Sequence, residues 1–193
     1  MKIVGVGCGP GMLTEDAVSA IENADLIYGS GRAIELASAH IRQGCDARII
    51  TDYKSLRTLP DNAVVLSTGD PMLAGLGYLP GEIISGISSY QYACAKLKIP
   101  MTKTTIVNAH AKDHEKAIED VSFEISRGKI AFVIADPEFD IDMLAKRLSA
   151  GSPGCKIAVC ERLGYPDERI STGNVNDPPA AESDLFVLFV GDF

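Results

Sequence analysis

The sequence has no tryptophan, no long apolar run and no excess of basic residues. No apolar run reaches the roughly 18–20 residues that a membrane-spanning helix needs, so we expect no transmembrane segment. Eighteen Lys and Arg residues stand against 26 Asp and Glu residues, which gives a net charge of −8. A general nucleic-acid binder needs a basic face to neutralise phosphates, so this balance disfavours that class of function.

Cysteine and histidine are also few, and their spacing predicts neither disulfides nor a metal site. The residues after Met1 form a short apolar stretch that runs into glycines, which is typical of a first strand and not of a secretory leader. We therefore expect a cytoplasmic protein with reduced, structural thiols. His110 and His114 are four residues apart, but no third ligand accompanies them. The five cysteines, which include no C-x-x-C pair, are Cys8, Cys45, Cys94, Cys155 and Cys160.

The first half alternates short apolar runs with helical patterns, as α/β proteins with a mainly parallel sheet do. The run AVVLST at 63–68 has no polar alternation, which is typical of a central parallel strand covered on both faces. We expect a helix to begin at Asp70 and Pro71. The other expected elements are strands at 2–6, 24–29, 47–51 and 81–85 and helices at 14–23, 32–40 and 88–97.

The second half ends in three apolar runs without helices between them, which predicts antiparallel pairing and a mixed sheet. The polar segment 96–105, which contains Pro100, is the best candidate for a linker. It divides the chain into a predicted N-terminal α/β domain, 1–103, and a C-terminal mixed-sheet α/β domain, 104–193. The expected elements are strands at 104–109, 129–135, 156–161, 169–173 and 185–191 and helices at 113–126 and 140–150.

A glycine-rich loop, G-V-G-C-G-P-G at 5–11, follows the first expected strand. Dinucleotide and phosphate loops occupy this place, but Pro10 stands where the third glycine of a dinucleotide fingerprint is needed. No acidic residue ends the second strand to hold a ribose, and no Gly-Lys-Ser/Thr follows the loop. The loop therefore favours neither NAD nor ATP binding, and taken alone it is a tight turn that needs glycines.

Two further loops change this interpretation. Ser67–Pro71 follows the strongest apolar run, and Gly86–Ser89 follows the strand expected at 81–85. Ligands of open α/β sheets bind outside the carboxyl ends of the strands, so three such loops together predict a site. Taken alone, Asp70 is more often a helix N-cap before a proline at the first helical position.

Three segments in this order resemble the signatures of the tetrapyrrole (corrin/porphyrin) methylases. They are GVGCGPGMLTEDAVSAIENADLIYG at 5–29, STGDPMLAGLG at 67–77 and GISSYQYACAKL at 86–97. The resemblance implies two small α/β domains with a cleft between them, S-adenosylmethionine as the methyl donor, which leaves as S-adenosylhomocysteine, and a homodimer. Methyl transfer from a sulfonium needs positioning more than acid–base help, which agrees with the absence of any nucleophile or base signature.

Within the family, two stretches resemble the stand-alone C5-methyltransferases of the cobalt-precorrin pathway. NAHAK at 108–112 is similar to S-x-H-G-R, and CERLGYPDER at 160–169 is similar to E-x-L-G-x-x-D-E-R. Asn108, Ala111 and Lys112 depart from the first pattern, so three alternatives stay open. They are a precorrin or uroporphyrinogen methylase acting at another ring carbon, a diphthine-type protein methyltransferase, and an inactive cofactor-binding module. For C15 methylation and decarboxylation the resemblance implies a separate partner enzyme.

The resemblance also implies a set of site residues. For Ala135 and Leu163, core packing is an equal alternative. The substrate would be a macrocycle with carboxylate arms, and Arg32, Lys103 and Lys112 are the candidate cations, with solvated surface as the alternative. His110 is the candidate catalytic residue, as a proton acceptor, a partner of a substrate carboxylate or a structural histidine. The implied cofactor contacts are Cys8, Asp70, Leu73, Ser88, Ser89, Ala135, Leu163 and Gly164.

Overall fold

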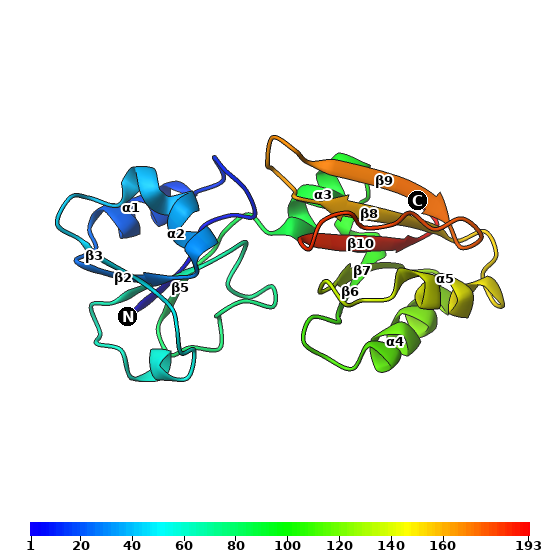
Figure 1. The fold of residues 1–193 in the computed structure, drawn as a ribbon, viewed down its shortest axis with the longest axis horizontal. Helices are drawn as coiled ribbons and strands as arrows, with labels where there is room; N and C mark the ends of the chain where they lie inside the picture. Colours follow the sequence, from blue (N-terminus) through cyan, green and yellow to red (C-terminus); the bar gives the residue numbers. More distant parts are fainter. The chain divides into compact units, whose positions relative to one another are not determined.

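The computed structural model describes all 193 residues, which form two compact units, Met1–Tyr92 and Ala93–Phe193 (Figure 1). Each unit is built on one five-stranded sheet, so the predicted α/β class is confirmed. The division between the units falls inside helix α3 (Ser89–Leu97). The domain boundary after Lys103 stays a prediction, because compactness alone does not show which segments fold independently.

The first sheet is entirely parallel, as the uninterrupted apolar runs predict. Its strand order is β3-β2-β4-β1-β5, which places β1 and β4 inside the sheet. Because all strands run the same way, the loops that follow them meet at one edge. The strands are β1 (Lys2–Gly5), β2 (Leu26–Gly29), β3 (Asp46–Ile49), β4 (Val64–Ser67) and β5 (Glu82–Ile84).

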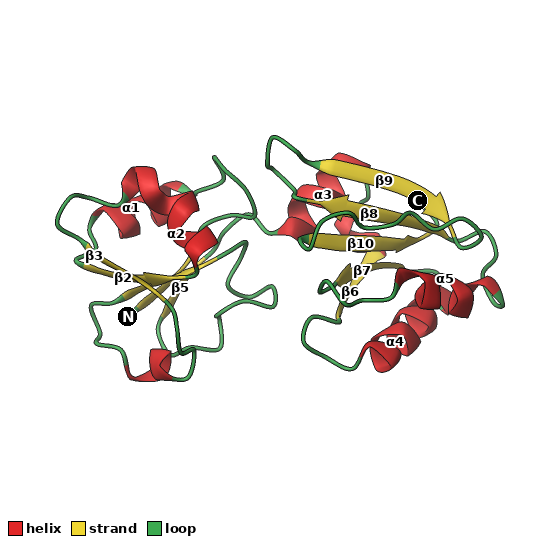
Figure 2. Ribbon diagram, viewed as in Figure 1, coloured by secondary structure: helices red, strands yellow, loops and turns green.

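Two short helices cover one face of this sheet, and loops with a 3-10 turn cover the other (Figure 2). Helix α1 (Glu15–Glu22) begins after Thr14, whose hydroxyl accepts a hydrogen bond from the Ala17 N–H, as the sequence predicts. Helix α2 (Gly31–Ala37) is capped in the same way by Ser30 and continues as the 3-10 turn Ser38–His40. Helix α2 is therefore shorter than expected.

The prediction of a helix beginning at Asp70 and Pro71 is wrong, because residues 70–81 form turns and bends. Glycines at 75, 77 and 81 make a helix costly there, since glycine loses the most backbone freedom when it becomes helical. A Cβ on Gly77 would lie 2.8 Å from the Pro71 carbonyl oxygen, so the chain folds back closely on itself. Leu76 and Leu79 of this segment pack against the face of the sheet that lacks helices.

The second sheet is mixed, as predicted. Its order is β6-β7-β10-β8-β9, with β6 and β7 parallel and all other neighbours antiparallel. Since β7 and β8 both run opposite to β10, the ends of β6, β7 and β8 lie along the same edge. The strands are β6 (Thr104–Asn108), β7 (Ile130–Ile134), β8 (Lys156–Glu161), β9 (Arg169–Asn174) and β10 (Phe186–Gly191).

Helices α4 (His114–Ser126) and α5 (Ile141–Ser149) pack on one face of the second sheet. Their N-termini are capped by the side chains of Asp113 and Asp140. On the other face Phe132 and Phe189 pack with their ring centroids 5.1 Å apart. None of the helices, of which α4 with 13 residues is the longest, combines the length and apolar composition that crossing a bilayer requires.

Candidate functional site

The three loops predicted to form a site do come together at one edge of the first sheet. They follow β1, β4 and β5, which are neighbours in the sheet. Gly7 and Gly69 form a two-bond bridge, with N···O distances of 3.2 and 2.8 Å. The Val6 N–H donates to the Ser67 carbonyl at 2.9 Å, so the first two loops continue the ladder of the sheet.

Glycine is required where these loops touch, because their backbones lie against one another. A Cβ on Gly5 would lie 2.5 Å from the Gly86 nitrogen, and one on Gly86 would lie 2.2 Å from the Gly69 carbonyl oxygen. Each of the three loops thus supplies one glycine to a single contact. The result is closely packed main chain in which Gly5 and Gly86 are buried and Gly69 is half buried. Glycines of this kind let backbone groups approach one another or a ligand.

Asp70 links two of the loops through its side chain. Its Oδ1 accepts a hydrogen bond from the Met72 N–H at 2.8 Å, and its Oδ2 accepts one from the Gly86 N–H at 3.0 Å. The alternative that Asp70 caps a helix is therefore wrong. Both carboxylate oxygens are bound to backbone donors, so the side chain shapes the loops in this structure.

The two predicted serines have different environments. Ser88 is buried, and its hydroxyl donates to Gln91 Oε1 at 2.7 Å and accepts from the Gln91 N–H at 3.1 Å. Gln91 Oε1 also accepts from the Ser88 N–H at 2.9 Å, which completes a capping box at the start of α3. The spacing S-x-x-Q is the signal by which the sequence could have assigned this structural role. Ser89 is only half buried and takes no part in the box.

The other predicted residues of the first unit lie at the same edge. The Cys8 Sγ lies 3.4 Å from the Met12 Sδ, and both side chains are buried. The burial of Cys8 therefore leaves little of its thiol accessible to a ligand. Leu73 is half buried, with its N–H bound to the Asp70 carbonyl at 3.1 Å. Arg32 lies near the start of α2, the helix that follows β2 at this edge.

In the second unit, most of the predicted residues follow strands that end at a common edge. His110 and Lys112 follow β6 and are exposed, and Ala135 follows β7 and is buried. Leu163 is buried after β8, and Gly164 has a φ of +80°, in the left-handed region. Burial of Ala135 and Leu163 agrees with the core-packing alternative and leaves little of either side chain for a ligand.

The loop that carries His110 and Lys112 is anchored by Asp136. The Asp136 Oδ2 accepts hydrogen bonds from the Ala111 N–H at 3.0 Å and from His114 Nε2 at 3.1 Å. Burial alone raises the pKa of Asp136, but the hydrogen bonds from Ala111 and His114 outweigh it and hold this pKa below its usual range. Asp136 is therefore ionised at neutral pH.

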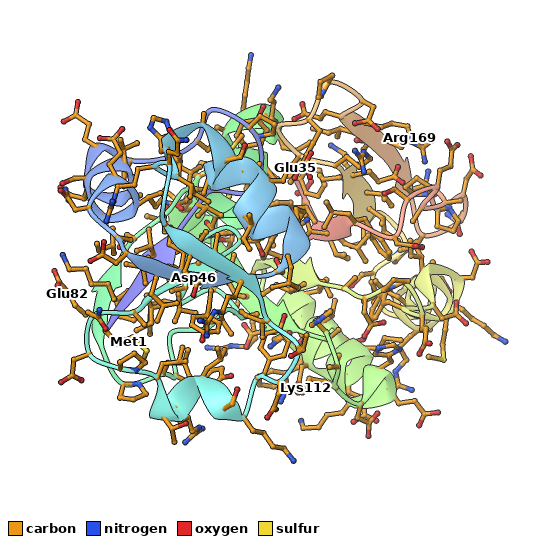
Figure 3. The ribbon with its side chains drawn as sticks, turned by 60° about the vertical axis from the view of Figure 1, so that its left-hand side comes forward. Met1, Glu35, Asp46, Glu82, Lys112 and Arg169 are labelled. Carbon is orange, nitrogen blue, oxygen red and sulfur yellow. The ribbon has the colours of Figure 1, made fainter.

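The CERLGYPDER segment is held by its own acidic residues. Glu161 is 2% exposed, and its Oε1 accepts from the Glu182 and Ser183 N–H groups at 2.6 and 2.7 Å. Its Oε2 accepts from Arg169 Nε at 2.6 Å; Figure 3 labels Arg169, which begins β9. Glu168 accepts a hydrogen bond from the Gly164 N–H at 2.7 Å. The segment that resembles a family pattern thus builds the loop after β8.

Lys103 is not brought together with His110 and Lys112. It precedes β6 whereas they follow it, so a strand of five residues, about 17 Å long, separates them. Lys103 instead lines a hollow of 840 Å³ with Arg127 and Lys129 at the opposite edge of the sheet. Lys103 precedes the strand expected at 104–109, so the rule that ligands bind beyond the carboxyl ends of strands argued against it already in the sequence.

Comparisons with known proteins agree on one family. The model described as tetrapyrrole (corrin/porphyrin) methylases matches residues 2–179. The chain is 33% identical over 190 residues to the probable cobalt-precorrin-7 C(5)-methyltransferase of Methanocaldococcus jannaschii, with 89% of each chain covered. It is 28% identical to the cobalt-precorrin-7 C(5)-methyltransferase of Salmonella typhimurium, with 88% of each covered. A precorrin-6Y methylase structure from Archaeoglobus fulgidus matches with a TM-score of 0.77 and 32% identity over 99% of this chain and 97% of that one.

Proposed function

Because the chain belongs to the tetrapyrrole (corrin/porphyrin) methylases, we propose that it methylates C5 of cobalt-precorrin-7 in cobalamin biosynthesis. The observation that carries this proposal is the 33% identity to the Methanocaldococcus jannaschii relative over 89% of both chains. A match of this extent reaches into both units, because neither unit makes up 89% of the chain. The Salmonella typhimurium relative, which bears the same activity in its name, supports the same substrate.

The three glycine-linked loops of the first unit are the proposed binding surface for S-adenosylmethionine. When bound, this cofactor supplies a methyl group already activated on a sulfonium. The fit rests on the close backbone contact of Gly5, Gly69 and Gly86, of which the half-buried Gly69 keeps accessible main-chain atoms. Asp70 and Ser88 shape this surface from within, since their side-chain oxygens are bound internally.

Direct contacts to the cofactor are accordingly proposed for the backbone at Cys8 and for the side chains of Leu73 and Ser89. Leu73 and Ser89 are only half buried, so both retain accessible atoms. The buried Ala135 and Leu163, with Gly164, stay predicted contacts. No acid or base is needed to activate the methyl group, so these residues contribute to the rate mainly by orienting the reactants. Such orientation lowers the entropic part of the activation barrier by several kcal/mol.

His110 and Lys112 are proposed to bind the carboxylate arms of the macrocycle. Both are exposed on one short loop, and the positive charge of Lys112 there, beside a histidine that can donate a hydrogen bond, lessens the conflict between an anionic substrate and a chain of net charge −8. Arg32 is a third candidate cation, on the first unit. A neutral His110 imidazole could instead accept the proton released when the methylated carbon re-forms its double bond.

The assembly and the setting of the protein are proposed as well. We propose a homodimer in the cytoplasm, where the five cysteines, none of which forms a disulfide in the structure, stay reduced. We also propose that methylation at C15 and decarboxylation belong to a separate partner enzyme, as the resemblance to the stand-alone C5-methyltransferases implies.

The activity is tested with the purified chain, methyl-labelled S-adenosylmethionine and cobalt-precorrin-7. We expect the product to gain the mass of one methylene, and carbon NMR to place the label on C5. Metal-free precorrin run in parallel decides whether cobalt is required. Label at another ring carbon, or label transferred only to a protein acceptor, contradicts the proposal.

The role of His110 is tested by His110→Ala and His110→Lys in single-turnover experiments between pH 5.5 and 8.5. Carboxylate pairing predicts a raised half-saturating substrate concentration that lysine partly restores. Proton acceptance predicts a chemical rate lowered by about 10²-fold that lysine does not restore, and a dependence of the rate on pH that differs from that of the wild type. Normal activity in both variants would show that His110 is structural. Cofactor affinity, measured by calorimetry, is expected to stay unchanged throughout.

A further inference from the structure

Asp136 reaches from the end of β7 to the neighbouring loop at residues 109–113, named here the His110 loop. The register of the parallel pair β6 and β7 places Asn108 opposite Ile134. One more ladder bond, from the Ala109 N–H to the Ile134 carbonyl at 2.9 Å, ends the pairing. Beyond that point the backbone of the His110 loop no longer pairs with β7. A hydrogen bond to the Asp136 carboxylate connects the loop to the end of β7 instead.

Three successive backbone N–H groups of the His110 loop are each held by a different acceptor. The His110 N–H donates to Asn108 Oδ1 at 3.1 Å, and the Lys112 N–H donates to the Ala109 carbonyl at 3.2 Å. Between them the Ala111 N–H donates to Asp136 Oδ2 at 3.0 Å. Of the three acceptors, only Asp136 belongs to a different strand connection.

The conformation held in this way is one that the loop disfavours by itself. Ala111 has a φ of +53°, in the left-handed region where a side chain other than glycine is strained. A strained residue persists only when surrounding contacts over-determine it. The bond from Ala111 to Asp136 supplies such a contact, so the shape of the His110 loop depends on it.

Asp136 is itself firmly placed. Its Oδ1 accepts from the Glu138 N–H at 3.2 Å, and its Oδ2 also accepts from His114 Nε2. The His114 ring packs edge-on against Phe139, with centroids 5.4 Å apart. Both carboxylate oxygens therefore accept hydrogen bonds from donors within the protein, which fixes the position of the Asp136 side chain.

We infer that Asp136 is a positioning residue that holds the His110 loop in the conformation presenting His110 and Lys112 together. The inference rests on the proposed function of that loop in binding the macrocycle. The carboxylate acts through the Ala111 backbone and touches no substrate atom. Its loss therefore affects substrate binding and leaves the glycine-linked loops of the first unit as they are.

Asp136→Ala and Asp136→Asn test the inference, with Asp140→Ala as the matched control. Asp140 also accepts a backbone hydrogen bond in the second unit, from the Met143 N–H at 2.8 Å, but it only caps α5. We expect Asp136→Ala to accelerate hydrogen exchange at residues 110–112 about tenfold, the effect of losing one such bond. The half-saturating substrate concentration should rise by about the same factor. Asparagine, which keeps one acceptor oxygen, should give intermediate values.

The controls separate positioning from general destabilisation. Asp140→Ala should lower the melting temperature without changing exchange in the His110 loop or the half-saturating concentration. Cofactor affinity should stay within about twofold in all variants. Unchanged exchange in both Asp136 variants would overturn the inference, as would faster exchange with unaltered substrate saturation. Exchange needs no turnover, so a wild-type chain that fails to methylate the macrocycle refutes the proposed function and still reports whether Asp136 holds the loop.

Discussion

The Asp70 carboxylate accepts a hydrogen bond from the Gly86 N–H at 3.0 Å, across 16 residues of sequence. This bond joins the loop after β4 to the loop after β5, although β1 lies between these strands in the sheet. The connection is possible because Gly5 and Gly86 have no side chains where their backbones touch. One acidic residue thus holds together a surface that comes from three parts of the chain.

Replacing Asp70 should therefore weaken the cofactor site and the fold at the same time. Asp70→Ala leaves the Met72 and Gly86 N–H groups without their acceptor, which should cost about 1.5–3 kcal/mol of stability. We expect cofactor affinity to fall at least tenfold, about 1.4 kcal/mol, by calorimetry. Asp70→Asn keeps one acceptor and should lose less of both. A stability loss with unchanged cofactor affinity would separate this contact from the proposed site.

Gly86→Ala should disrupt the contact of the three loops directly. The new methyl group would lie 2.2 Å from the Gly69 carbonyl oxygen, and backbone on both sides must move to admit it. Overpacking of this kind costs about 1–3 kcal/mol. Gly31→Ala is the matched control, because nothing lies within 4 Å of a Cβ there. Thermal unfolding compares the two, and equal melting temperatures would contradict the packing described for Gly86.

Glu161 should be among the most sensitive positions of the second unit. Its side chain is 2% exposed and binds Arg169 and two backbone N–H groups. Glu161→Ala leaves the guanidinium and both donors without this partner, at a cost of about 3–5 kcal/mol. The other carboxylate that binds Arg169 is that of Glu182, and the Glu182 side chain is 73% exposed. Glu182→Ala should therefore cost about 0–1 kcal/mol. Urea unfolding of both variants measures the difference, and similar losses would show that burial of Glu161 has no effect.

Asp136 should make stability depend on pH in acid. Its pKa is lower in the folded chain than in the unfolded one, so the unfolded chain binds a proton first as the pH falls. The stability that the carboxylate contributes is complete above about pH 4 and is lost as the pH falls through the folded pKa. Urea midpoints of the wild type and of Asp136→Asn should therefore converge between pH 5 and pH 2. A constant gap between the two curves would speak against this assignment.

Cys160 should resist alkylation in the native protein. Burial, with smaller contributions from Glu168, Cys94 and Glu161, raises the pKa of its thiol to about 12. Thiolates are the reactive form, so almost none is present at pH 8. We expect iodoacetamide to label the partly exposed Cys45 first, and Cys160 only after unfolding in urea. Peptide mass spectrometry measures both rates, and fast native labelling of Cys160 would contradict the burial seen here.

The fold was predictable where the pattern of apolar residues is regular. The central strand β4 follows from a short apolar run, and the antiparallel end of the second sheet follows from three expected strands with no helix between them. The segment 70–81 was mispredicted because Asp and Pro are equally good at starting a helix or a turn. The glycines that follow, and the close return of the chain at Gly77, decided in favour of turns.

The position of the candidate site in the fold was predictable from the sequence, but the roles of its side chains were not. Three loops at one sheet edge follow from strand order, and the structure confirms their contact. That Asp70 and Ser88 use their oxygens inside the protein was not visible without the partners Gly86 and Gln91. Asp136 carried no sequence signal at all, because its role depends on Ala111, 25 residues away and on another strand connection.

The strand order of the first sheet also sets when that unit can form during synthesis. β1 pairs only with β4 and β5, and β2 pairs only with β3 and β4. The first two strands to emerge from the ribosome, β1 and β2, therefore do not pair with each other. They are joined only when β4 (Val64–Ser67) is synthesised and pairs with both. A nascent chain stalled before that point leaves β1 without a partner and one edge of β2 open, so the unit is expected to need chaperone protection over its first 60 or so residues.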